Sequence, residues 1–423
     1  MILTTKKTGT RLILLLASFL VACTISYQSI KTAIAAHEIQ KNTLSGYKKA
    51  TALEPDNPQN WYLFARYLQL NIENSDPQAA IATYKRALSL DPRNSDYWAG
   101  LASVYESLGS FEDARKAFVE AIRGYPESAD IHWQYGNFLL RRGELPAAFG
   151  QFRFTLQRDP KRALEVISRC WRAEPDIYIM LQQVLPASTP IYLDSVNFLL
   201  NEKETDAALV VWERIVLLQA RLRLQDVNLL LEVLLQKGRA SEAIQVWDQA
   251  LKLSESNRPP SVPGSLVWDG GFETDISDVG FAWRFRDYRG AFHGFDKRIK
   301  HSGNRSLRIT FVGTENVSFA GACQFVPIEP GITYDFEGWL RTENIATTDR
   351  GINFFLSANG DPRTEASPEL FGTHDWTRFV LPWKAAAGSH VLQICVARQA
   401  SSLSFERISG TVWADDVLLT PAP

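Results

Sequence analysis

The chain has 423 residues, which is more than one hydrophobic core usually serves, so its length predicts at least two domains. Its 45 basic and 47 acidic side chains nearly cancel, and no dense stripe of lysine and arginine runs along any stretch. This balance argues against a nucleic-acid partner.

The N-terminus carries a basic cluster followed by an apolar run. Three basic residues and no acid precede an apolar stretch from Leu12 to about Ile30, close to the roughly 20 residues that a helix needs to cross a bilayer. Because the positive side stays in the cytoplasm, we expect residues 1–11 to form a cytoplasmic tail and residues 12–31 a membrane anchor. The rest of the chain would then face the periplasm of a bacterial cell envelope.

Two alternatives remain open for this segment. The sequence LVAC at 20–23 is typical of a lipoprotein signal, in which Cys23 carries the lipid, and a short apolar core is also compatible with a cleaved signal peptide. We favour the uncleaved anchor because apolar residues continue past Cys23 as far as Ile34, where a lipoprotein usually has a polar tether. Each alternative still exports the chain.

A period of 34 residues relates Pro92, Pro126 and Pro160. Between the first two prolines, small and aromatic side chains recur with the spacing of a helix pair: Trp98, Ala102, Tyr105, Gly109, Ala114, Phe118 and Ala121. Small residues let two helices approach closely, large aromatic side chains fill the space between them, and proline ends the second helix. The pattern resembles the tetratricopeptide repeat, a helix pair with this period that stacks into arrays.

This resemblance covers residues 37–160 well and residues 161–253, as degenerate repeats, more loosely. The unit after the complete one keeps the small residues but has His132 in the place of the motif's tryptophan, with Trp133 one position later. Prolines interrupt the range 161–190, so we expect irregular helices there. An earlier second helix is indicated by Tyr47, Ala50 and Pro55.

Arrays of such pairs form an α-solenoid whose concave groove is lined by first helices, and the resemblance implies that this groove binds a peptide or a partner protein. The groove positions fall on Tyr62, Arg66, Gln69, Ser103, Glu106, Trp133, Asn137 and Arg141. Trp98 occupies a packing position and is expected in the core. Trp133 is displaced to the groove side, where an aromatic ring beside Asn137 and Arg141 suits a binding surface. Packing on the neighbouring repeat is the alternative.

The helical pattern stops at a proline-rich linker, residues 254–264, which we expect to be stiff and extended. Beyond it, residues 265–423 form short segments of alternating polar and apolar residues, such as 306–311 and 333–338. Roughly eight to ten such strands fit, enough for an antiparallel β-sandwich. The predicted fold is therefore multidomain α plus β: a transmembrane helix, an α-solenoid and a sandwich.

Motifs follow one another along this last segment: DGGFE at 269–273, HSGNRSLR at 301–308, QFV at 324–326, GWLR at 338–341 and DDV at 415–417. In this order they resemble the galactose-binding-like jelly roll of carbohydrate-binding modules in families four and nine. The resemblance implies a jelly-roll sandwich and a polysaccharide as the ligand to consider first.

Sugar recognition needs a flat aromatic ring and polar side chains for the hydroxyl groups. Alternation along the strand 334–341 puts Glu337, Trp339 and Arg341 on one face, opposite the apolar set that includes Phe336. We therefore expect these three side chains to form a sugar platform. The alternative is a tryptophan half covered by a loop, beside solvated neighbours.

A second aromatic segment offers other sugar-binding candidates. Tyr288 and Phe292 lie in a glycine-punctuated stretch that reads as a loop or an edge, where aromatic residues often bind ligands. In contrast, Trp283, Trp376 and Trp383 stand in apolar strands, so we expect all three in the core.

The resemblance also implies a structural calcium ion, held by Glu273 and by Asp415 or Asp416. The alternative is that these carboxylates cap turns by accepting backbone hydrogen bonds. Cys323 and Cys395 lie in the same domain and in an oxidising compartment, which permits a disulfide between them. Their apolar flanks favour the other interpretation, two free thiols that pack as small hydrophobic side chains.

No catalytic motif is present: the sequence has no nucleophile elbow, phosphate-binding loop, HExxH or paired-cysteine metal site. We expect a non-enzymatic protein that requires no cofactor. In one hypothesis it is an anchored scaffold that docks a protein on its repeats and holds a glycan on its sandwich, in surface or exopolysaccharide assembly or export. In the other it is purely a protein-interaction scaffold, and the sandwich binds no sugar.

Overall fold

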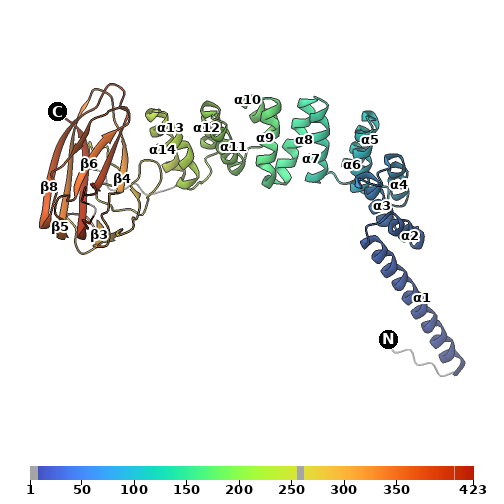
Figure 1. Ribbon diagram of the computed structural model, residues 1–423. Helices are drawn as coiled ribbons and strands as arrows, with labels where there is room; N and C mark the ends of the chain where they lie inside the picture. The colour runs from blue at the N-terminus through green and yellow to red at the C-terminus, as the bar shows by residue number, and fades with distance from the viewer. Residues whose placement is uncertain (1–7, 255–261, 404) are drawn as a thin grey trace. The chain divides into compact units, whose positions relative to one another are not determined.

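The structure is a computed structural model that describes residues 8–254, 262–403 and 405–423 (Figure 1). Its contacts divide the chain into two compact units, one ending at Pro186 and the other beginning at Ala187. The lysines of the predicted cytoplasmic tail and most of the predicted proline-rich linker lie outside the described residues.

A long apolar helix, α1 (Thr8–Gln40), begins the described chain. By length and composition alone, residues 11–40 could cross a membrane, and the 18-residue window inside them has a mean hydropathy of 1.9 with none of it buried. At about 1.5 Å per residue the helix is about 50 Å long, more than the roughly 30 Å of a hydrocarbon core. The helix is thus a candidate membrane span, with length to spare at its C-terminal end.

The C-terminal end of α1 is part of the helical array. The end of α1 packs against α2 (Leu44–Leu53), where Ala35 of α1 is fully buried. Gly46 of α2 lies so close to the backbone of α1 that a Cβ there would stand 2.3 Å from the carbonyl oxygen of Glu38. The second helix indicated by Tyr47 and Ala50 therefore has its partner in α1, which continues into the array without a break.

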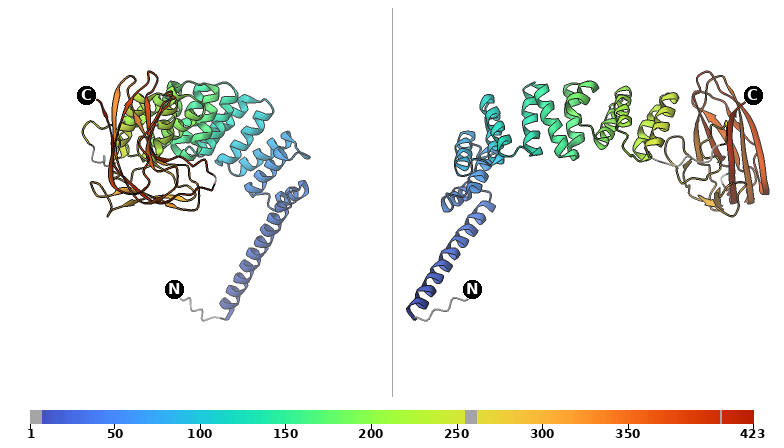
Figure 2. Two further views of the ribbon diagram at one scale, coloured as in Figure 1. Left: turned by 60° about the vertical axis from the view of Figure 1, so that its left-hand side comes forward. Right: turned by 180° about the vertical axis from the view of Figure 1, so that it is seen from behind.

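Three helix pairs follow in this unit, packed as α3 with α4, α5 with α6, and α7 with α8 (Figure 2). Their bounds are α3 Pro58–Leu70, α4 Pro77–Leu90, α5 Ser95–Ser107, α6 Phe111–Gly124, α7 Ala129–Arg141 and α8 Leu145–Arg158. The small residues of the motif are buried between the helices, with Ala102 and Ala114 at 0% exposure. Large side chains fit against them: a Cβ added to Gly136 would meet the ring of Phe152 at 2.8 Å.

One hydrogen bond recurs with the sequence period. The indole nitrogen of Trp98 donates to the carbonyl oxygen of Pro92 at 2.9 Å, and Trp61 makes the same bond to the proline six residues before it. In the next unit, the imidazole Nε2 of His132 lies 2.9 Å from the carbonyl oxygen of Pro126. His132 therefore takes the structural place of the tryptophan, which confirms the alignment of the three units.

The helices after α8 are less regular, as the prolines predict. The remaining helical elements are η1 Pro160–Arg162, α9 Ala163–Ala173, α10 Ile177–Ile179, the π-helical turn η2 Met180–Val184, α11 Thr189–Asn201, α12 Thr205–Leu218, η3 Leu224–Val227, α13 Asn228–Gln236 and α14 Ala240–Ser254. The second compact unit begins between η2 and α11, inside the range that the sequence presents as one degenerate array.

The C-terminal part is an antiparallel β-sandwich of two sheets, as predicted. One sheet has the strand order β1-β4-β9-β6-β7 and the other β2-β3-β10-β5-β8. The strands are β1 Arg284–Phe285, β2 Ala291–Asp296, β3 Ser306–Val312, β4 Phe319–Pro327, β5 Thr333–Ala346, β6 Asn353–Ala358, β7 Thr364–Ala366, β8 Gly372–Lys384, β9 Val391–Arg398 and β10 Ser409–Pro421. Their inward side chains, such as Phe336 and Phe354, make one continuous apolar core.

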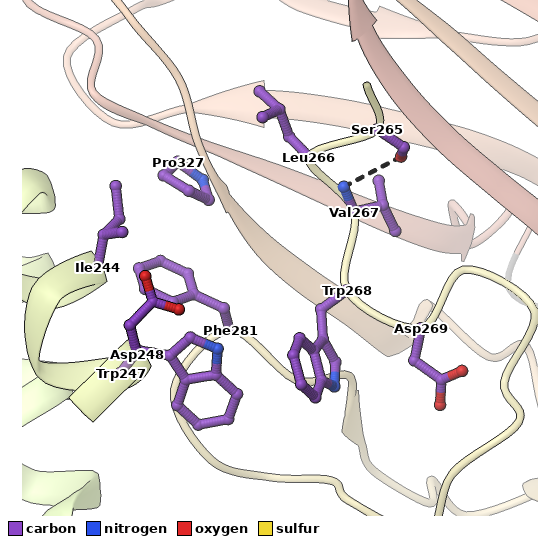
Figure 3. A pocket seen from close by; sticks show the side chains of 10 residues that line it. All are labelled: Ile244, Trp247, Asp248, Ser265, Leu266, Val267, Trp268, Asp269, Phe281 and Pro327. Atoms are coloured by element: carbon purple, nitrogen blue, oxygen red, sulfur yellow. Dashed lines mark hydrogen bonds between the residues drawn. The ribbon is translucent and has the colours of Figure 1, made fainter. Parts of the chain in front are cut away.

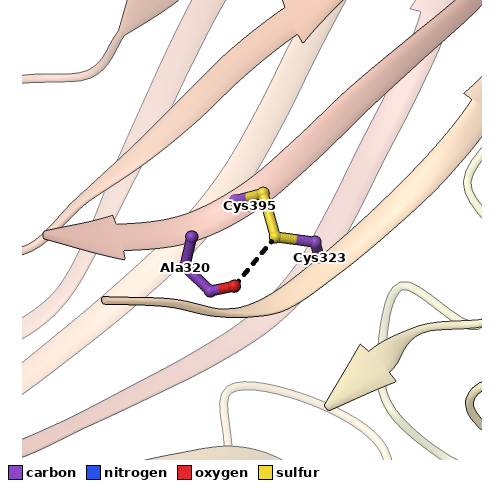
Figure 4. Close-up of a disulfide and its surroundings, with 3 residues drawn as sticks. All are labelled: Ala320, Cys323 and Cys395. Atoms are coloured by element: carbon purple, nitrogen blue, oxygen red, sulfur yellow. Dashed lines mark hydrogen bonds between the residues drawn. A yellow bond between two sulfur atoms is a disulfide. The ribbon is translucent and has the colours of Figure 1, made fainter. Parts of the chain in front are cut away.

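The structure joins Cys323 and Cys395 in a disulfide, so the expectation of two free thiols is wrong (Figure 4). The two residues face each other directly across the antiparallel pair β4 and β9, with their Cα atoms 4.1 Å apart. Apolar flanking residues are compatible with either state of a cysteine. The strand register decides between them, and register is not visible in the sequence.

Candidate functional site

The groove candidates of α3 contact the next repeat. Tyr62 stacks on Tyr97 of α5, with ring centroids 4.8 Å apart, and meets Tyr84 edge to face at 6.0 Å. The guanidinium group of Arg66 lies 5.7 Å from the ring centroid of Tyr62. Burial raises the pKa of the Tyr62 hydroxyl. These contacts connect neighbouring repeats, and Arg66 remains exposed.

Two further candidates form an ion pair between repeats. Arg141 of α7 binds Glu106 of α5 with two hydrogen bonds, Nε to Oε1 at 2.7 Å and Nη2 to Oε2 at 2.8 Å. A paired guanidinium and carboxylate hold two side chains in one geometry, which fixes α5 against α7. The side chain of Arg141 remains 57% exposed, so a partner could still reach it.

Trp133 is half-buried and lies among side chains of the following helices. The guanidinium groups of Arg162 and Arg169 lie 5.4 Å and 4.9 Å from its ring centroid, and Phe152 contacts it from α8. The amide of Asn137 donates to the carbonyl oxygen of Trp133 at 2.7 Å. The structure therefore shows Trp133 packed on the neighbouring repeat. This is the alternative to a ring exposed in the groove.

On the sandwich, the predicted alternation of β5 is confirmed. Tyr334, Phe336 and Leu340 are buried in the core, while Glu337 and Trp339 are partly exposed on the outer face. These residues belong to β5, which pairs with β10 on one side and with β8 on the other. This places the proposed platform one strand from the edge of the sheet.

The ring face expected to receive a sugar is covered in the structure. The imidazole of His301 stacks on Trp339 with ring centroids 3.9 Å apart and meets Trp376 edge to face at 5.6 Å. We call His301, Trp339 and Trp376 the outer-face cluster. Trp376 is partly exposed here, so the expectation that it belongs to the core is wrong, whereas Trp283 and Trp383 are buried as predicted.

Two ion pairs flank the outer-face cluster. Arg378 of β8 binds both oxygens of Glu337 at 2.7 Å, and this hydrogen bonding lowers the pKa of the Glu337 carboxyl despite partial burial. Arg341 donates to Asp375 at 2.6 Å. Planar guanidinium and carboxylate groups next to aromatic rings are the residue types that hydrogen-bond sugar hydroxyls. Alternation along one strand identifies Glu337 and Arg341 from the sequence. Their ion-pair partners lie on β8 and can be identified only when the strand pairing is known.

The alternative aromatic candidates lie elsewhere on the same sheet. Phe292 is 48% exposed on the edge strand β2, and strands β3 and β10 separate it from β5. Tyr288 instead packs against Phe319 of the core, with ring centroids 5.5 Å apart. The structure therefore does not bring these two residues together with Trp339 in one site.

The carboxylates proposed as calcium ligands are bonded to the loop that carries His301. Asp415 accepts backbone hydrogen bonds from His301, Ser302 and Asp416, and Glu273 accepts them from Asn304. The remaining oxygens are also occupied: His301 Nδ1 and Ser302 Oγ bind Asp416, and the Asn304 amide binds Glu273. Each carboxylate oxygen already has a protein donor, which fits caps better than a cation that takes 6–8 oxygen ligands.

Burial also changes the pKa of one of these carboxylates. Asp415 is fully buried, and desolvation raises the pKa of its carboxyl to about 6, against the effect of its backbone hydrogen bonds. Among the described residues, no group of three or more His, Cys, Asp or Glu side chains is arranged to hold a metal ion.

An aromatic junction links the last helix pair to the sandwich within the second unit. Trp247 of α14 meets Trp268 and Phe281 edge to face, with centroids 5.3 Å and 6.3 Å apart, and a cavity of about 370 Å³ lies beside them (Figure 3). A Cβ on Gly280 would stand 2.5 Å from the ring of Trp247, so only glycine fits there. No local pattern in the sequence predicts this contact, because its members are far apart along the chain.

These features define a helical-repeat protein with a β-sandwich. Two family models of the tetratricopeptide repeat match it, over residues 71–122 and 102–163, and the chain contains tetratricopeptide repeats there. A curated relative is the tRNA(Glu)-specific nuclease WapA of Bacillus subtilis subsp. natto, 28% identical over 199 residues. That match covers 44% of this chain, and the chain spans only 8% of the relative's length.

Some solved structures are similar to less than half of the chain. The MamA protein is 18% identical with a TM-score of 0.30, over 44% of this chain and 89% of MamA. A family 61 carbohydrate-binding module in complex with β-1,4-galactotriose is 17% identical with a TM-score of 0.27, over 37% and 99% of the two chains. The C-terminal family 22 module of Clostridium thermocellum Xyn10B is also 17% identical, with a TM-score of 0.27, over 38% and 98%.

Proposed function

We propose that the protein is a membrane-anchored scaffold of the bacterial cell envelope, without catalytic activity. Its tetratricopeptide repeats dock a partner protein, and its sandwich holds a glycan during assembly or export of a surface polysaccharide or exopolysaccharide. The repeats support the docking role because their stacked helices expose side chains, such as Arg66 and Arg141, on a surface built from several units.

The outer-face cluster is the observation that carries the glycan part. Apolar ring surface from His301 and Trp376 lies beside two paired arginines on a solvent-facing sheet. Because His301 covers Trp339, we place the sugar against His301 and Trp376, with Trp339 supporting the imidazole from behind. Glu337 and Arg341 then hydrogen-bond the hydroxyl groups.

A glycan array probed with the full chain in detergent tests this part. Trp376→Ala should weaken binding of a selected glycan by about 30-fold, because a central aromatic contact contributes about 2 kcal/mol or more. Trp339→Ala should weaken it less, because Trp339 supports His301 from behind and does not contact the sugar. Phe292→Ala is the matched control, since it removes a 48% exposed ring from a distant strand of the same sheet. Loss of binding in the control alone would move the site to β2.

Site-specific photocrosslinking in cells tests the docking part. A photoreactive residue at Arg66 should yield a crosslinked protein partner, whereas one at the exposed Glu112, on the second helix of a pair, should yield none or a different product. Repeated failure at Arg66 and at Arg141 would count against docking on these helices.

Cellular location has its own test. A reporter fused after Pro423 should be active only outside the cytoplasm, because the basic residues precede the apolar helix. Cytoplasmic activity would overturn the proposed topology. Release of the protein from the membrane by Cys23→Ser would replace the helical anchor with a lipid.

The aromatic junction favours a second candidate function, in which the sandwich is a structural end to the helical array and binds no sugar. Trp247 and Phe281 are nearly fully buried at this contact, and Arg284 of β1 binds Glu232 of α13 at 2.5 Å. An absence of glycan binding, together with a loss of helical stability when the sandwich is deleted, would support this candidate.

A further inference from the structure

A cavity of about 530 Å³ opens on the surface between α7 and α9. Its lining comes from Leu140, Leu164, Glu165, Ser168, Arg169 and Arg172. The side chain of Leu164 is 57% exposed, which leaves apolar surface open to solvent beside charged groups. We call these residues the α7–α9 cavity.

The lining of this cavity holds two arginine side chains, Arg169 and Arg172. Arg169 lies over the ring of Trp133, and Arg172 bonds only to Ser168 on its own helix, at 2.6 Å to the hydroxyl. Neither makes an ion pair with another residue that the structure describes. By contrast, the nearby Arg162 pairs with Asp130 and Asp159.

The cavity is therefore positively charged, since its lining holds two arginines and the single carboxylate of Glu165. Arginine binds carboxylates through two parallel hydrogen bonds, and such charge-assisted bonds are roughly twice as strong as neutral ones. Arg169 is held against Trp133, so less of its conformational freedom is lost when it binds an anion.

The exposed leucine side chain points to a peptide rather than to a free anion. Leu164 is 57% exposed and lines the same cavity as Arg169 and Arg172. A free carboxylate or phosphate ion leaves this apolar surface in contact with water. A peptide covers it with an apolar side chain while its acidic side chains pair with the two arginines.

We propose that the α7–α9 cavity binds an extended acidic segment of the partner protein. An apolar side chain of that segment covers Leu140 and Leu164, and acidic side chains on either side pair with Arg169 and Arg172. This inference rests on the proposed docking function and names the chemistry that the docked partner presents.

Fluorescence anisotropy with synthetic peptides tests the proposal on the full chain in detergent. The probes are nonapeptides with a central leucine, flanked by aspartate and glutamate in one, by glutamine in the second and by lysine in the third. Only the acidic probe should bind, and binding should weaken with rising salt. Arg169→Glu with Arg172→Glu should weaken it by about 30-fold or more, because attraction becomes repulsion.

The control is Arg123→Glu, which makes the same charge change at a 70% exposed arginine of α6. It should leave binding within about twofold of the unchanged chain. Circular dichroism reports whether each variant keeps its helices. The double variant Arg169→Lys with Arg172→Lys is a second test. It keeps the positive charge but loses the two-bond geometry of arginine, so its affinity should lie between those of the unchanged chain and the double glutamate variant.

Equal binding of all probes would overturn the proposal, as would acidic binding that the Arg169 and Arg172 substitutions leave unchanged. Failure to bind any probe would also overturn it. The docking function is tested separately by the crosslink at Arg66. A crosslinked partner without acidic-peptide binding would contradict only the assignment of the cavity. Absence of both would sink the docking function as well.

Discussion

The imidazole of His301 stacks on the indole of Trp339, with ring centroids 3.9 Å apart and ring planes 21° apart. His301 comes from the turn between β2 and β3, and it is held there by Asp416 of β10, which binds its Nδ1 at 2.6 Å. The last strand of the sandwich therefore positions the ring that covers Trp339 on the outer face.

His301→Ala should weaken glycan binding by about 3- to 10-fold, because it removes one aromatic contact and leaves Trp339 without its cover. His301→Phe keeps a ring for stacking but loses the bond to Asp416, so it should weaken binding less. Both are measured by titration of the glycan selected on the array. Tighter binding by His301→Ala would show that the sugar stacks on Trp339 itself and that His301 competes with it.

Asp415 should make stability fall as the pH rises from about 4 to about 6. Burial raises its pKa to about 6 in the folded protein, above the ordinary value of 3.8, so the folded chain keeps a proton that the unfolded chain releases. Raising this pKa from 3.8 to about 6 changes the free energy of unfolding by at most about 3 kcal/mol. Denaturant titrations at pH 4 and pH 7 measure it.

The comparison that isolates this effect is Asp415→Asn, which cannot ionise. The parent chain should lose up to about 3 kcal/mol of unfolding free energy between pH 4 and pH 7 because a buried carboxyl must ionise. In the variant this loss should be absent. An identical pH dependence of variant and parent would show that Asp415 is ionised without cost in the folded protein.

Chelation should not change the melting temperature of the sandwich. Glu273, Asp415 and Asp416 already accept hydrogen bonds from the 301–304 loop on all their carboxylate oxygens, so the fold does not need a cation to balance them. Melting is compared in EDTA and in millimolar calcium chloride. A calcium-dependent rise of several degrees would show that the ion replaces some of these donors.

The sequence predicted features that repeat and missed those that depend on pairing. The prolines at a 34-residue step fixed the helix pairs, because every unit repeats the same packing of small against large residues. Trp376 and the Cys323–Cys395 bond were assigned wrongly, since an apolar strand looks the same whichever residue lies opposite it. His301 opens the HSGNRSLR motif at 301–308, but nothing local in the sequence shows that this loop folds over β5.

Ala114→Trp should destabilise the repeats by about 1–3 kcal/mol, because this alanine is fully buried between α5 and α6 and a larger side chain overpacks the contact. The loss should spread to adjacent repeats through their shared interfaces. Glu112→Trp places the same ring on the exposed side of α6 and is the control. A melting curve that Ala114→Trp leaves unchanged would contradict the assigned repeat register.

The continuity of α1 with the array leads to the last prediction, which compares two truncated chains. A chain that begins at Lys31 keeps the part of α1 that packs on α2, whereas one that begins at Thr43 loses it and exposes the side of α2 that carries Gly46. The shorter chain should be less stable by about 1–3 kcal/mol, because the buried contact of Ala35 is lost and apolar surface of α2 meets water. Denaturant unfolding followed by circular dichroism measures both. Lys31 is a sound starting point because the exposed apolar side chains before it, such as Leu12 and Ile25, contribute no buried surface to the array. Equal stability of the two chains would show that α1 is only a tether, joined to the repeats in sequence but not part of their fold.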